Sequence, residues 1–555
     1  MLSKFWEFLN ENEAPRAYAR GIRPFLQGSE IPRSRKGSIH PTGLRPWFSA
    51  KGDKFIFLLL FLLVAATYVN SIHNEFVVDD IPVIAANPLI GSPENIFPPL
   101  SGFVQRSFYF LAHQVGGLNP APYRLINIFF HLGSVFCLFA ILNLLSGRTI
   151  ATMTAMLFAV HPILVESVGW ISGSLYVQYA FFFLLSFLLY ILGTENRKYY
   201  FASLSIFALS LLASEKAVPL FLVFFLYEIA FGNPKKNWKK TMPYAILAAA
   251  GTALYFGGLG QRIDTMENVN RMAPGLDNPF QVMPIAVFFY LKLLLWPAKL
   301  TLYHTEMIFT TKFFIFMACF SILFFAAILW GYRRNRYVFF WLSFFIISLL
   351  ATLTPFRISW VVAERYVYLG SAGIMAAAAW ILNGMAKNRN WRGAIFAIFS
   401  LIVISLSIRT VIRNRDWKNE DNLIIASAKV SRHGFAIHKD LGEVYRRQGK
   451  IDEAISELKK AIAMNPRYAD AYHNLGNTYQ QIGNFKEAIA NYEKAVEFNP
   501  GLWQTYYNLC AVYYQLGRYN LAYRNIKKAI KLNPNDKNLR EIKSLLESQG
   551  SYPDE

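Results

Sequence analysis

The chain has 555 residues, of which 54% are hydrophobic, and it carries a formal net charge of +21. In a soluble protein this charge would indicate a nucleic-acid partner. Here the chain contains long apolar runs, so its positive charge is better explained by Lys and Arg that flank membrane spans. We therefore expect no nucleic-acid partner. The cysteines lie too far apart to indicate a disulfide framework or a thiolate metal site; they are Cys137, Cys319 and Cys510.

The first three quarters of the chain have the pattern of a polytopic membrane protein. Residues 1–54 are mostly polar, so the first apolar run is not a cleaved signal peptide, and we expect a basic cytoplasmic tail here. Residues 55–412 alternate apolar runs with short polar breaks, and about 20 apolar residues span the hydrocarbon core of a bilayer. We therefore predict an all-α helix bundle with about eleven spans. They lie near 55–71, 122–145, 150–165, 174–193, 199–213, 217–232, 241–258, 313–331, 337–353, 366–384 and 392–411.

The charges of the polar breaks predict the topology. One set, such as 235–240 and 333–336, is rich in Lys and Arg, and the other set is poor in them. Because Lys and Arg favour the cytoplasmic side, the N-terminus should lie inside and the C-terminal domain outside. Residues 282–300 are apolar but short and bounded by prolines, so we expect an interfacial or re-entrant helix there. The chain contains no Asn-x-Ser/Thr acceptor, which favours a bacterial inner (plasma) membrane, with the ER membrane as the alternative.

Residues 413–555 have the composition of a soluble domain, and the predicted topology places this domain outside (extracytoplasmic). From about residue 435 the sequence repeats with a period of 34. This is the tetratricopeptide pattern, in which small residues let paired helices pack closely and a proline ends each second helix. Such an α-solenoid presents a concave surface for an extended peptide, although a rigid spacer or a dimerisation module would show the same pattern. The equivalent positions are Gly442, Gly476 and Cys510; Gly449, Gly483 and Gly517; Ala454, Ala488 and Ala522; and Pro466, Pro500 and Pro534. The candidate residues of an acceptor groove are Tyr472, Asn474, Tyr506 and Asn508.

Two adjacent carboxylates, Asp79 and Asp80, follow the first predicted span. Charges this close to the hydrocarbon region are costly to place there without a use. Further acids and bases recur at the outer ends of later spans, and in a packed bundle they would converge on one cleft. These residues are Arg106, Arg124, His161, Glu166, Glu215, Lys216, Glu364 and Arg365.

The residue types in this predicted cleft suit sugar transfer from a lipid phosphate to a hydroxyl. An acid pair can deprotonate a hydroxyl or hold a metal, and Arg and Lys can bind a phosphate and stabilise it as a leaving group. Structural roles remain open for each residue. They are a helix cap for Asp79 and Asp80, a helix end at His161, ion pairs for Glu215–Lys216 and Glu364–Arg365, and an interhelical hydrogen bond for His131.

Four segments carry a family resemblance, in the same order as in that family. They are Phe76–Asn87 with its Phe-x-x-Asp-Asp, Pro122–His131, His161–Trp170 with its His-Pro-x-x-x-Glu, and Ala363–Gly373 with its Glu-Arg-x-x-Tyr. Over about residues 55–540 the chain resembles the transmembrane and tetratricopeptide-repeat-containing O-mannosyltransferases and their bacterial relatives, within the GT-C glycosyltransferases. The resemblance implies a GT-C fold and transfer of a sugar from a polyprenyl- or dolichyl-phosphate carrier to a protein Ser or Thr.

The resemblance also implies roles for the matching residues. Asp79 or Asp80 would be the catalytic base, and a divalent metal (Mg²⁺ or Mn²⁺), if present, would be held by both with Glu166. By residue type rather than by resemblance, the donor phosphate would be bound by Arg106, Arg124, Lys216 and Arg365. The site would be shaped by Asn87, His161, Glu166, Glu215, Glu364 and Tyr368. Departures such as Ser214-Glu-Lys216, where the family has Lys-Glu, leave open the sugar and the choice between a mono- and a diphosphate carrier.

We therefore expect a membrane glycosyltransferase that works by single displacement with inversion, and whose repeats recruit the acceptor polypeptide. Two alternatives remain. One is an enzyme of the same fold that glycosylates lipid-linked or envelope glycans. The other is a non-catalytic scaffold that anchors the repeats to the membrane.

Overall fold

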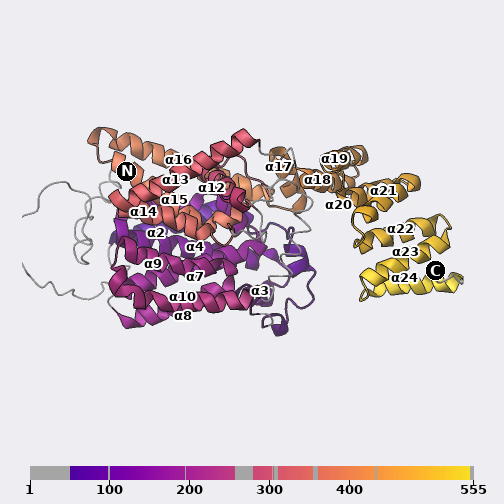
Figure 1. Cartoon of the computed structure of the whole chain (residues 1–555), viewed down its shortest axis with the longest axis horizontal. Coiled ribbons are helices and arrows are strands. Elements are labelled where there is room, and N and C mark those ends of the chain that lie inside the picture. The colour runs from indigo at the N-terminus through magenta and orange to yellow at the C-terminus, as the bar shows by residue number, and fades with distance from the viewer. Residues whose placement is uncertain are drawn as a thin grey trace, which may run out of the picture. The chain divides into compact units, whose positions relative to one another are not determined.

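The computed structural model describes residues 51–97, 100–193, 196–256, 279–302, 304, 310–353, 361–431 and 434–550. Every regular element in these ranges is a helix (Figure 1), so the predicted all-α class is confirmed. The predicted tail at 1–54 lies almost wholly outside them. The chain divides into two compact units. Unit 1 contains Met1–Glu267, Leu276–Leu300 and Phe309–Asn422, and unit 2 contains Asn268–Gly275, Thr301–Ile308 and Leu423–Glu555.

A helix of unit 1 occupies each of the predicted spans. These helices are α2 (Lys51–Tyr68), α4 (Pro120–Ser146), α5 (Arg148–Val160), α7 (Ser174–Leu192), α8 (Arg197–Ala213), α9 (Phe221–Ala230), α10 (Pro234–Phe256), α13 (Thr311–Arg334), α14 (Arg336–Leu349), α15 (Tyr368–Met385) and α16 (Arg389–Asp416). Between them lie α3 (Phe103–Gly116), α6 (Val165–Val168) and α12 (Pro279–Leu295). Short turns of helix lie in the breaks predicted to be outside: η3 (Ile81–Ala85), η5 (Pro162–Leu164), η6 (Ile171–Gly173), η7 (Glu215–Leu220) and η8 (Glu364–Val367).

Fewer helices than predicted are long and apolar enough to cross a bilayer. Among the described residues six qualify, or seven if α5 and the segment Pro162–Val168, bent by 52° from it, form one span. The helices α8, α9, α10 and α14 fall short because α8, α9 and α14 have only 17, 10 and 14 residues and α10 begins with a lysine-rich turn. The apolar part of α12, Met283–Leu295, is likewise short. The prediction of eleven spans therefore located the apolar helices better than it counted crossings.

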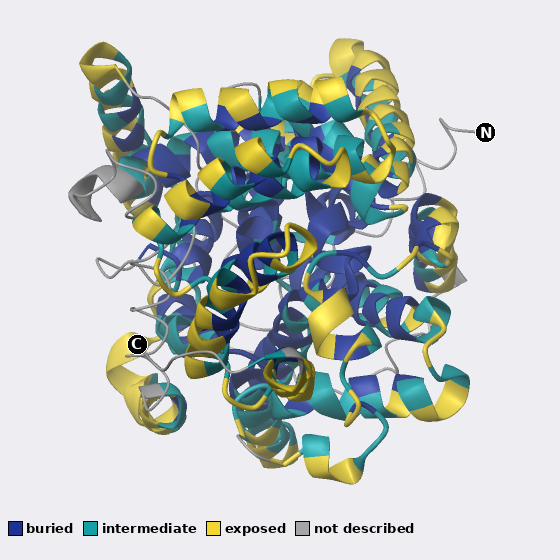
Figure 2. Cartoon of the chain, turned by 90° about the vertical axis from the view of Figure 1, so that its right-hand side faces the viewer, coloured by how far each residue is buried: buried dark blue, intermediate teal, exposed yellow. Residues whose placement is uncertain are grey.

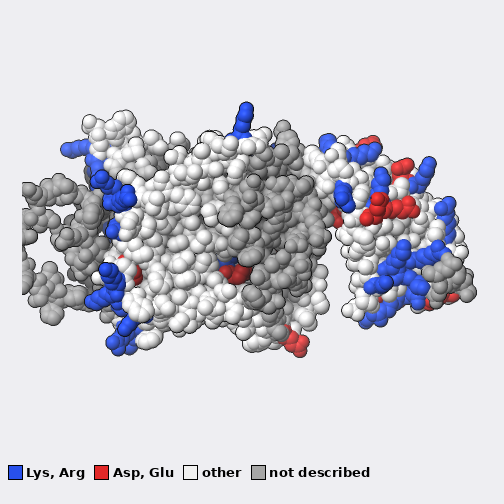
Figure 3. All heavy atoms as spheres, in the orientation of Figure 1, with Lys and Arg blue, Asp and Glu red and all other residues white. Residues whose placement is uncertain are grey.

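The surface of unit 1 is that of an integral membrane protein. In α13, the side chains of Ile322, Leu323 and Leu329 are each about two-thirds exposed, at 66%, 68% and 67%. In Figure 3 the visible Lys and Arg of unit 1 gather mostly at one end of the bundle, and uncharged surface covers most of its middle. This distribution fits apolar side chains in contact with lipid and charges at the bilayer surface.

Inside unit 1, small residues and one ion pair bring helices together. A Cβ on Gly373 of α15 would lie 2.4 Å from the Trp341 carbonyl oxygen of α14, so only glycine permits this close approach. At the start of α5, Arg148 binds Asp53 of α2 at 2.7 Å, with both side chains almost fully buried. Figure 2 shows buried residues along the inward faces of the helices and exposed residues along their outward faces.

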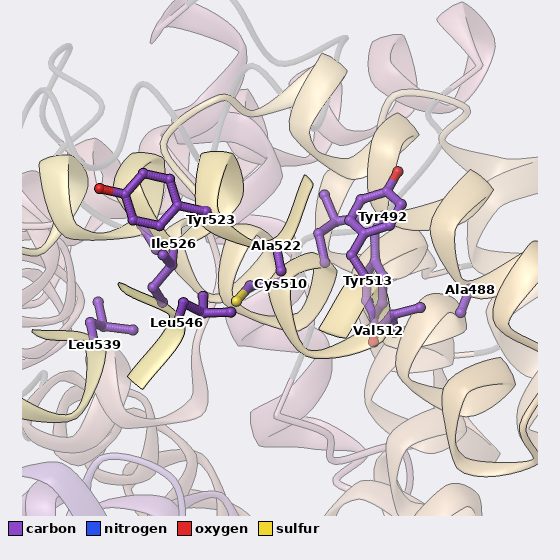
Figure 4. Packing of buried hydrophobic residues seen from close by; sticks show 12 residues of the cluster. Ala488, Tyr492, Cys510, Val512, Tyr513, Ala522, Tyr523, Ile526, Leu539 and Leu546 are labelled. Carbon is purple, nitrogen blue, oxygen red and sulfur yellow. The ribbon is translucent and has the colours of Figure 1, made fainter. Parts of the chain in front are cut away.

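Unit 2 is built from paired helices with the predicted period. The pairs are α18 (Phe435–Arg447) with α19 (Ile451–Met464), α20 (Ala469–Gln481) with α21 (Phe485–Phe498), and α22 (Trp503–Gln515) with α23 (Tyr519–Leu532); α17 (Glu420–Val430) precedes them and α24 (Lys537–Gln549) follows. Gly449, Gly483 and Gly517 have φ of 75°, 72° and 70°, a conformation that favours glycine at the turn within each pair. The core of the last repeats, shown in Figure 4, packs Tyr492 and Cys510 with the alanines of the repeat.

Candidate functional site

In the predicted first outer loop, the adjacent Asp79 and Asp80 have different surroundings. Asp80 is fully buried and accepts hydrogen bonds from Ser172 N at 2.7 Å, Ser172 Oγ at 2.6 Å and Val77 N at 3.2 Å. Burial raises the pKa of Asp80 to about 6, against the opposing effect of these hydrogen bonds and of the Arg124 charge. Asp80 precedes η3, but its side chain caps no N–H of that turn, so the helix-cap alternative does not hold for it. Asp79 is exposed.

The buried carboxylate of Asp80 therefore has a different task from that of Asp79. Its oxygens bind one backbone N–H of its own loop and two donors of residue 172, in the predicted second outer segment (161–173), 92 residues away along the chain. It holds these two segments together. Asp79 is the exposed carboxylate of the two.

Two cations and one acid of the predicted set meet around aromatic rings. Glu166 accepts a hydrogen bond from the backbone N of Arg365 at 2.8 Å and forms an ion pair with the guanidinium of the same residue. The Arg365 Cζ atom lies 5.0 Å from the centroid of the Tyr366 ring, and the Nζ atom of Lys216 lies 5.9 Å from that centroid. Lys216 also binds its neighbour Glu215 at 2.8 Å, as the ion-pair alternative predicted. The two cations therefore share Tyr366.

Trp170 joins the cation cluster, which is Arg365 with Lys216, to the acid loop, which is residues 77–80 with Asp79 and Asp80. Its ring centroid lies 5.5 Å from the Cζ atom of Arg365, and its indole Nε1–H donates to the carbonyl of Val77 at 3.3 Å. Arg106 is partly buried near the same region, where its guanidinium donates to the carbonyls of Ser101 at 2.8 Å and Ile96 at 3.3 Å. Gln105, the neighbour of Arg106, donates to the carbonyl of Ser172 at 3.3 Å.

Arg124 does not lie where the predicted phosphate contact would place it. It is fully buried and donates from Nε to the Gly169 carbonyl at 2.9 Å. Its other nitrogens donate to the carbonyls of Asn74 and Glu75. The guanidinium thus holds both outer loops to the start of α4, and we correct its expected role from phosphate binding to loop attachment.

Three residues predicted to shape the site make local or interhelical contacts instead. Asn87 closes a turn by accepting from Leu89 N at 3.0 Å, and His161 accepts from Ile163 N at 3.3 Å and approaches the Leu294 carbonyl at 3.0 Å. The hydroxyl of Tyr368 lies 2.8 Å from Nδ1 of His131, which is the interhelical hydrogen bond expected for that histidine.

Glu364 has a different partner from the one its sequence neighbour suggested. It is fully buried and pairs with Arg413 of α16 at 3.2 Å, whereas Arg365 pairs with Glu166. The expected Glu364–Arg365 pair is therefore wrong. Sequence reasoning missed Arg413, Trp170 and Ser172. Arg413 could have been found because it is a positive charge at the predicted outer end of the last span, where Lys and Arg are disfavoured. Its buried partner Glu364 explains why an arginine lies there.

The carboxylates proposed as metal ligands are not assembled as a metal site. In the part of the chain that the structure describes, no three His, Cys, Asp or Glu side chains are grouped so that they could hold a metal ion. Both oxygens of Asp80 and both oxygens of Glu166 already accept hydrogen bonds from protein groups. The residues present therefore do not fit a metal site made of Asp79, Asp80 and Glu166.

Unit 2 contains a polar hollow of about 640 Å³ near the ends of the first helices of three repeats. Its lining consists of amide and guanidinium side chains: Arg446, Arg447, Asn477, Gln480, Gln481, Asn508 and Gln515. Three of the amide oxygens accept internal hydrogen bonds, at 2.7 Å from Asn508 to Asn477, 2.6 Å from Tyr492 to Gln480, and 2.9 Å from Arg446 to Gln481. The amide N–H groups of these three acceptor side chains are then left for a bound molecule, so the hollow is rich in hydrogen-bond donors.

Of the predicted groove residues, Asn508 belongs to this lining, whereas Tyr472, Asn474 and Tyr506 do not. The two tyrosines face the second helix of their own repeat: Lys494 lies 5.5 Å from the Tyr472 ring centroid, and Lys528 lies 5.5 Å from that of Tyr506. Tyr472 is buried within its repeat and Tyr506 is partly buried, so their place in an acceptor groove stays a prediction. The lining residues on the last helical turns could have been found because Arg447, Gln481 and Gln515 are spaced by 34 residues.

Comparisons with known proteins cover both parts of the chain. Residues 442–483 match a family model described as TPR repeat, and residues 469–502 and 503–536 match the tetratricopeptide repeat model, so the predicted repeats are confirmed. A crystal structure of ArnT from Cupriavidus metallidurans bound to undecaprenyl phosphate aligns with a TM-score of 0.42 and 13% identity, over 81% of this chain and 80% of that one.

The sequence relatives are O-mannosyl-transferases. The chain is 24% identical over 483 residues to the Homo sapiens protein O-mannosyl-transferase TMTC3, which covers 74% of this chain and 52% of that protein. It is 26% identical over 457 residues to Homo sapiens TMTC2, with 65% and 54% covered. The chain thus spans about half the length of the curated relatives it matches. It is similar in sequence to the protein O-mannosyl-transferases, in agreement with the resemblance of its motifs.

Proposed function

We propose that the chain is a membrane glycosyltransferase of the GT-C type that transfers a sugar from a lipid-phosphate carrier to Ser or Thr hydroxyls of an extracytoplasmic protein. One observation carries the proposal: an exposed carboxylate, Asp79, lies in a loop that shares Trp170 with the cation Arg365. A base and a phosphate-binding cation held by one side chain suit a reaction in which a hydroxyl loses a proton while a phosphate leaves. The similarity to O-mannosyl-transferases supports the same reaction class.

In the proposed reaction Asp79 takes the proton of the acceptor hydroxyl, and the acceptor oxygen forms a bond to the anomeric carbon. The bond between that carbon and the phosphate oxygen breaks, and the electron pair leaves with the phosphate. The positive charges of Arg365 and Lys216 stabilise the departing phosphate. Attack from the face opposite the leaving group inverts the anomeric carbon. Asp80 takes no part as a base, because its oxygens hold Ser172 and Val77.

The donor-rich hollow of unit 2 supports a polypeptide as the acceptor. An extended polypeptide offers a row of carbonyl oxygens, and the amide N–H groups of Asn477, Gln480 and Gln481 are suited to bind them. We propose that the repeats recruit the acceptor through this hollow. We further propose a bacterial inner membrane, with the repeats on the extracytoplasmic side.

The test is glycosylation in cells that lack the native gene, with and without a plasmid-borne copy. Intact masses of envelope and secreted proteins would show a defined sugar mass that depends on the copy. Purified enzyme supplied with polyprenyl-phosphate-linked mannose, or with a diphosphate-linked sugar, would then identify the carrier. A sugar added to envelope glycans and to no protein would favour the glycan-modifying alternative. Unchanged proteins and glycans would contradict the proposed activity.

A further inference from the structure

The acid loop contains a backbone conformation that its own sequence does not favour. Val78, the residue before Asp79, has a φ of 52°, and it is the one non-glycine residue of the described chain with positive φ. A β-branched side chain is a genuine outlier in this left-handed region, where glycine is the ordinary occupant. Such a conformation persists only where the surrounding structure holds it, and it is most often found at functional sites.

Contacts on both sides of Val78 hold it there. On one side, the N–H of Val77 donates to Asp80 Oδ2 at 3.2 Å and the carbonyl of Val77 accepts from Trp170 Nε1 at 3.3 Å. On the other side, Asp80 is fastened to Ser172 at 2.6 and 2.7 Å. Both anchors come from the second outer segment, in which Trp170 and Ser172 are two residues apart. Within the loop, the N–H of Asp80 also donates to the carbonyl of Val77 at 3.0 Å. The conformation of residues 77–80 is therefore held both by this turn and by residues 170–172.

The second outer segment is itself rigidly placed. The Trp170 carbonyl accepts from Asn127 Nδ2 at 3.0 Å, and the preceding Gly169 carbonyl accepts from Arg124 Nε at 2.9 Å. Trp170 is only 5% exposed, and its ring contacts both the guanidinium of Arg365 and the ring of Trp417, whose centroid is 5.9 Å away. The indole N–H thus reaches Val77 from a side chain with little freedom to move.

We propose that Trp170 is a positioning residue, which sets the place of Asp79 by holding the Val77 carbonyl and thereby keeping Val78 at positive φ. This inference rests on the proposed role of Asp79 as the base. Trp170 touches neither donor nor acceptor in the proposed reaction. Its ring lies against Arg365 and its N–H holds Val77, two residues before the base, so that the cation and the loop that carries the base are aligned before substrate binds.

The test is Trp170→Phe, which keeps an aromatic ring under Arg365 and removes the N–H. We expect kcat for sugar transfer to fall about tenfold, equivalent to about 1.4 kcal/mol, with the KM for the lipid donor unchanged. The matched control is Trp341→Phe. Trp341 of α14 is fully buried and its Nε1 has no hydrogen-bond partner among the described residues, so this loss of an N–H should leave kcat within about twofold of wild type.

A second background separates positioning from simple packing. Glycine adopts positive φ without strain, so Val78→Gly removes the need for the anchor. In the Val78→Gly background, Trp170→Phe should lower kcat by less than about threefold. An equal fall of kcat in both backgrounds would overturn the proposal, because loss of packing does not depend on the residue at position 78.

A structural measurement keeps the inference testable apart from activity. Hydrogen–deuterium exchange of the peptide around residues 76–83 should be faster in Trp170→Phe than in wild type or in Trp341→Phe. Faster exchange in a chain whose wild type transfers no sugar would refute the proposed function and leave the anchoring role of Trp170 intact. Unchanged exchange together with unchanged kcat would refute the anchoring role itself.

Discussion

Replacing Glu364 by Gln should destabilise unit 1, because it leaves the charge of Arg413 buried without its main partner. Nη2 of Arg413 lies 3.2 and 3.4 Å from the two oxygens of Glu364, and the two side chains are 1% and 0% exposed. Removing one partner of such a buried pair typically costs about 3–5 kcal/mol. Asp416 remains 3.3 Å from Nη1 of Arg413, so we expect the lower end, about 3 kcal/mol.

The double variant provides the critical comparison. Arg413→Met alone leaves the Glu364 carboxylate buried without its guanidinium and should cost about 3–5 kcal/mol. The combination of Glu364→Gln and Arg413→Met removes both charges, so it should be more stable than Arg413→Met alone. The control is Arg415→Met in the same helix. Arg415 is exposed, so its loss should change the free energy of unfolding by less than about 0.5 kcal/mol.

The assay is unfolding of the purified chain in mixed micelles by titration with a denaturing detergent, followed by tryptophan fluorescence. Trp417 is a suitable reporter, since its ring centroid lies 5.9 Å from Cζ of Arg413. A double variant whose loss of stability equals the sum of the two single losses would refute the reasoning, because independent losses would mean that the two charges do not act on each other.

The site and the hollow give three further predictions. The pKa of Asp80 is raised from its ordinary 3.8 to about 6, so the folded state holds the proton of this carboxyl more tightly than the unfolded state does. The protonated carboxyl therefore contributes about 3 kcal/mol to stability below a pH of about 4, and this contribution is lost as pH rises through about 6. Denaturation measured across this range should show no such fall of stability with pH in Asp80→Asn. Arg365→Lys should raise the KM for the lipid donor about tenfold or more, because lysine cannot reproduce the planar contact with Trp170 and the pair with Glu166; an unchanged KM in steady-state kinetics would remove Arg365 from the phosphate site. Asn508→Ala should weaken acceptor-peptide binding in calorimetry several-fold, whereas Asn474→Ala, one repeat earlier and outside the hollow, should not; equal effects would place the peptide elsewhere.

Periodic features of the sequence determined the parts of the fold that could be predicted. Apolar runs located the helices of unit 1, and the 34-residue spacing located the paired helices of unit 2, because both signals are repeated over many residues. Counts of membrane crossings were less accurate. Length and charge near the helix ends decide them, and α9, with 10 residues, and α14, with 14, are short for a span.

The partners of buried charges were not predictable from neighbouring residues. Asp79 and Asp80 are equivalent by sequence, and Ser172, 92 residues later, makes Asp80 the buried one. Glu364 stands beside Arg365 in sequence but pairs with Arg413. A periodic repeat likewise does not tell its concave surface from its interior, and Tyr472, which was expected in the groove, is buried within its repeat.

The central claim is that Asp79, and not Asp80, is the base. The most direct test compares Asp79→Asn with Asp80→Asn, at matched expression, in cells lacking the native gene, by the intact mass of the glycosylated proteins and by kcat of the purified enzymes. We expect Asp79→Asn to stay folded and to lose at least about a hundredfold in kcat, whereas Asp80→Asn should lose less and should change the pH dependence of stability. Full glycosylation by Asp79→Asn, with loss of activity in a stably folded Asp80→Asn, would contradict this claim.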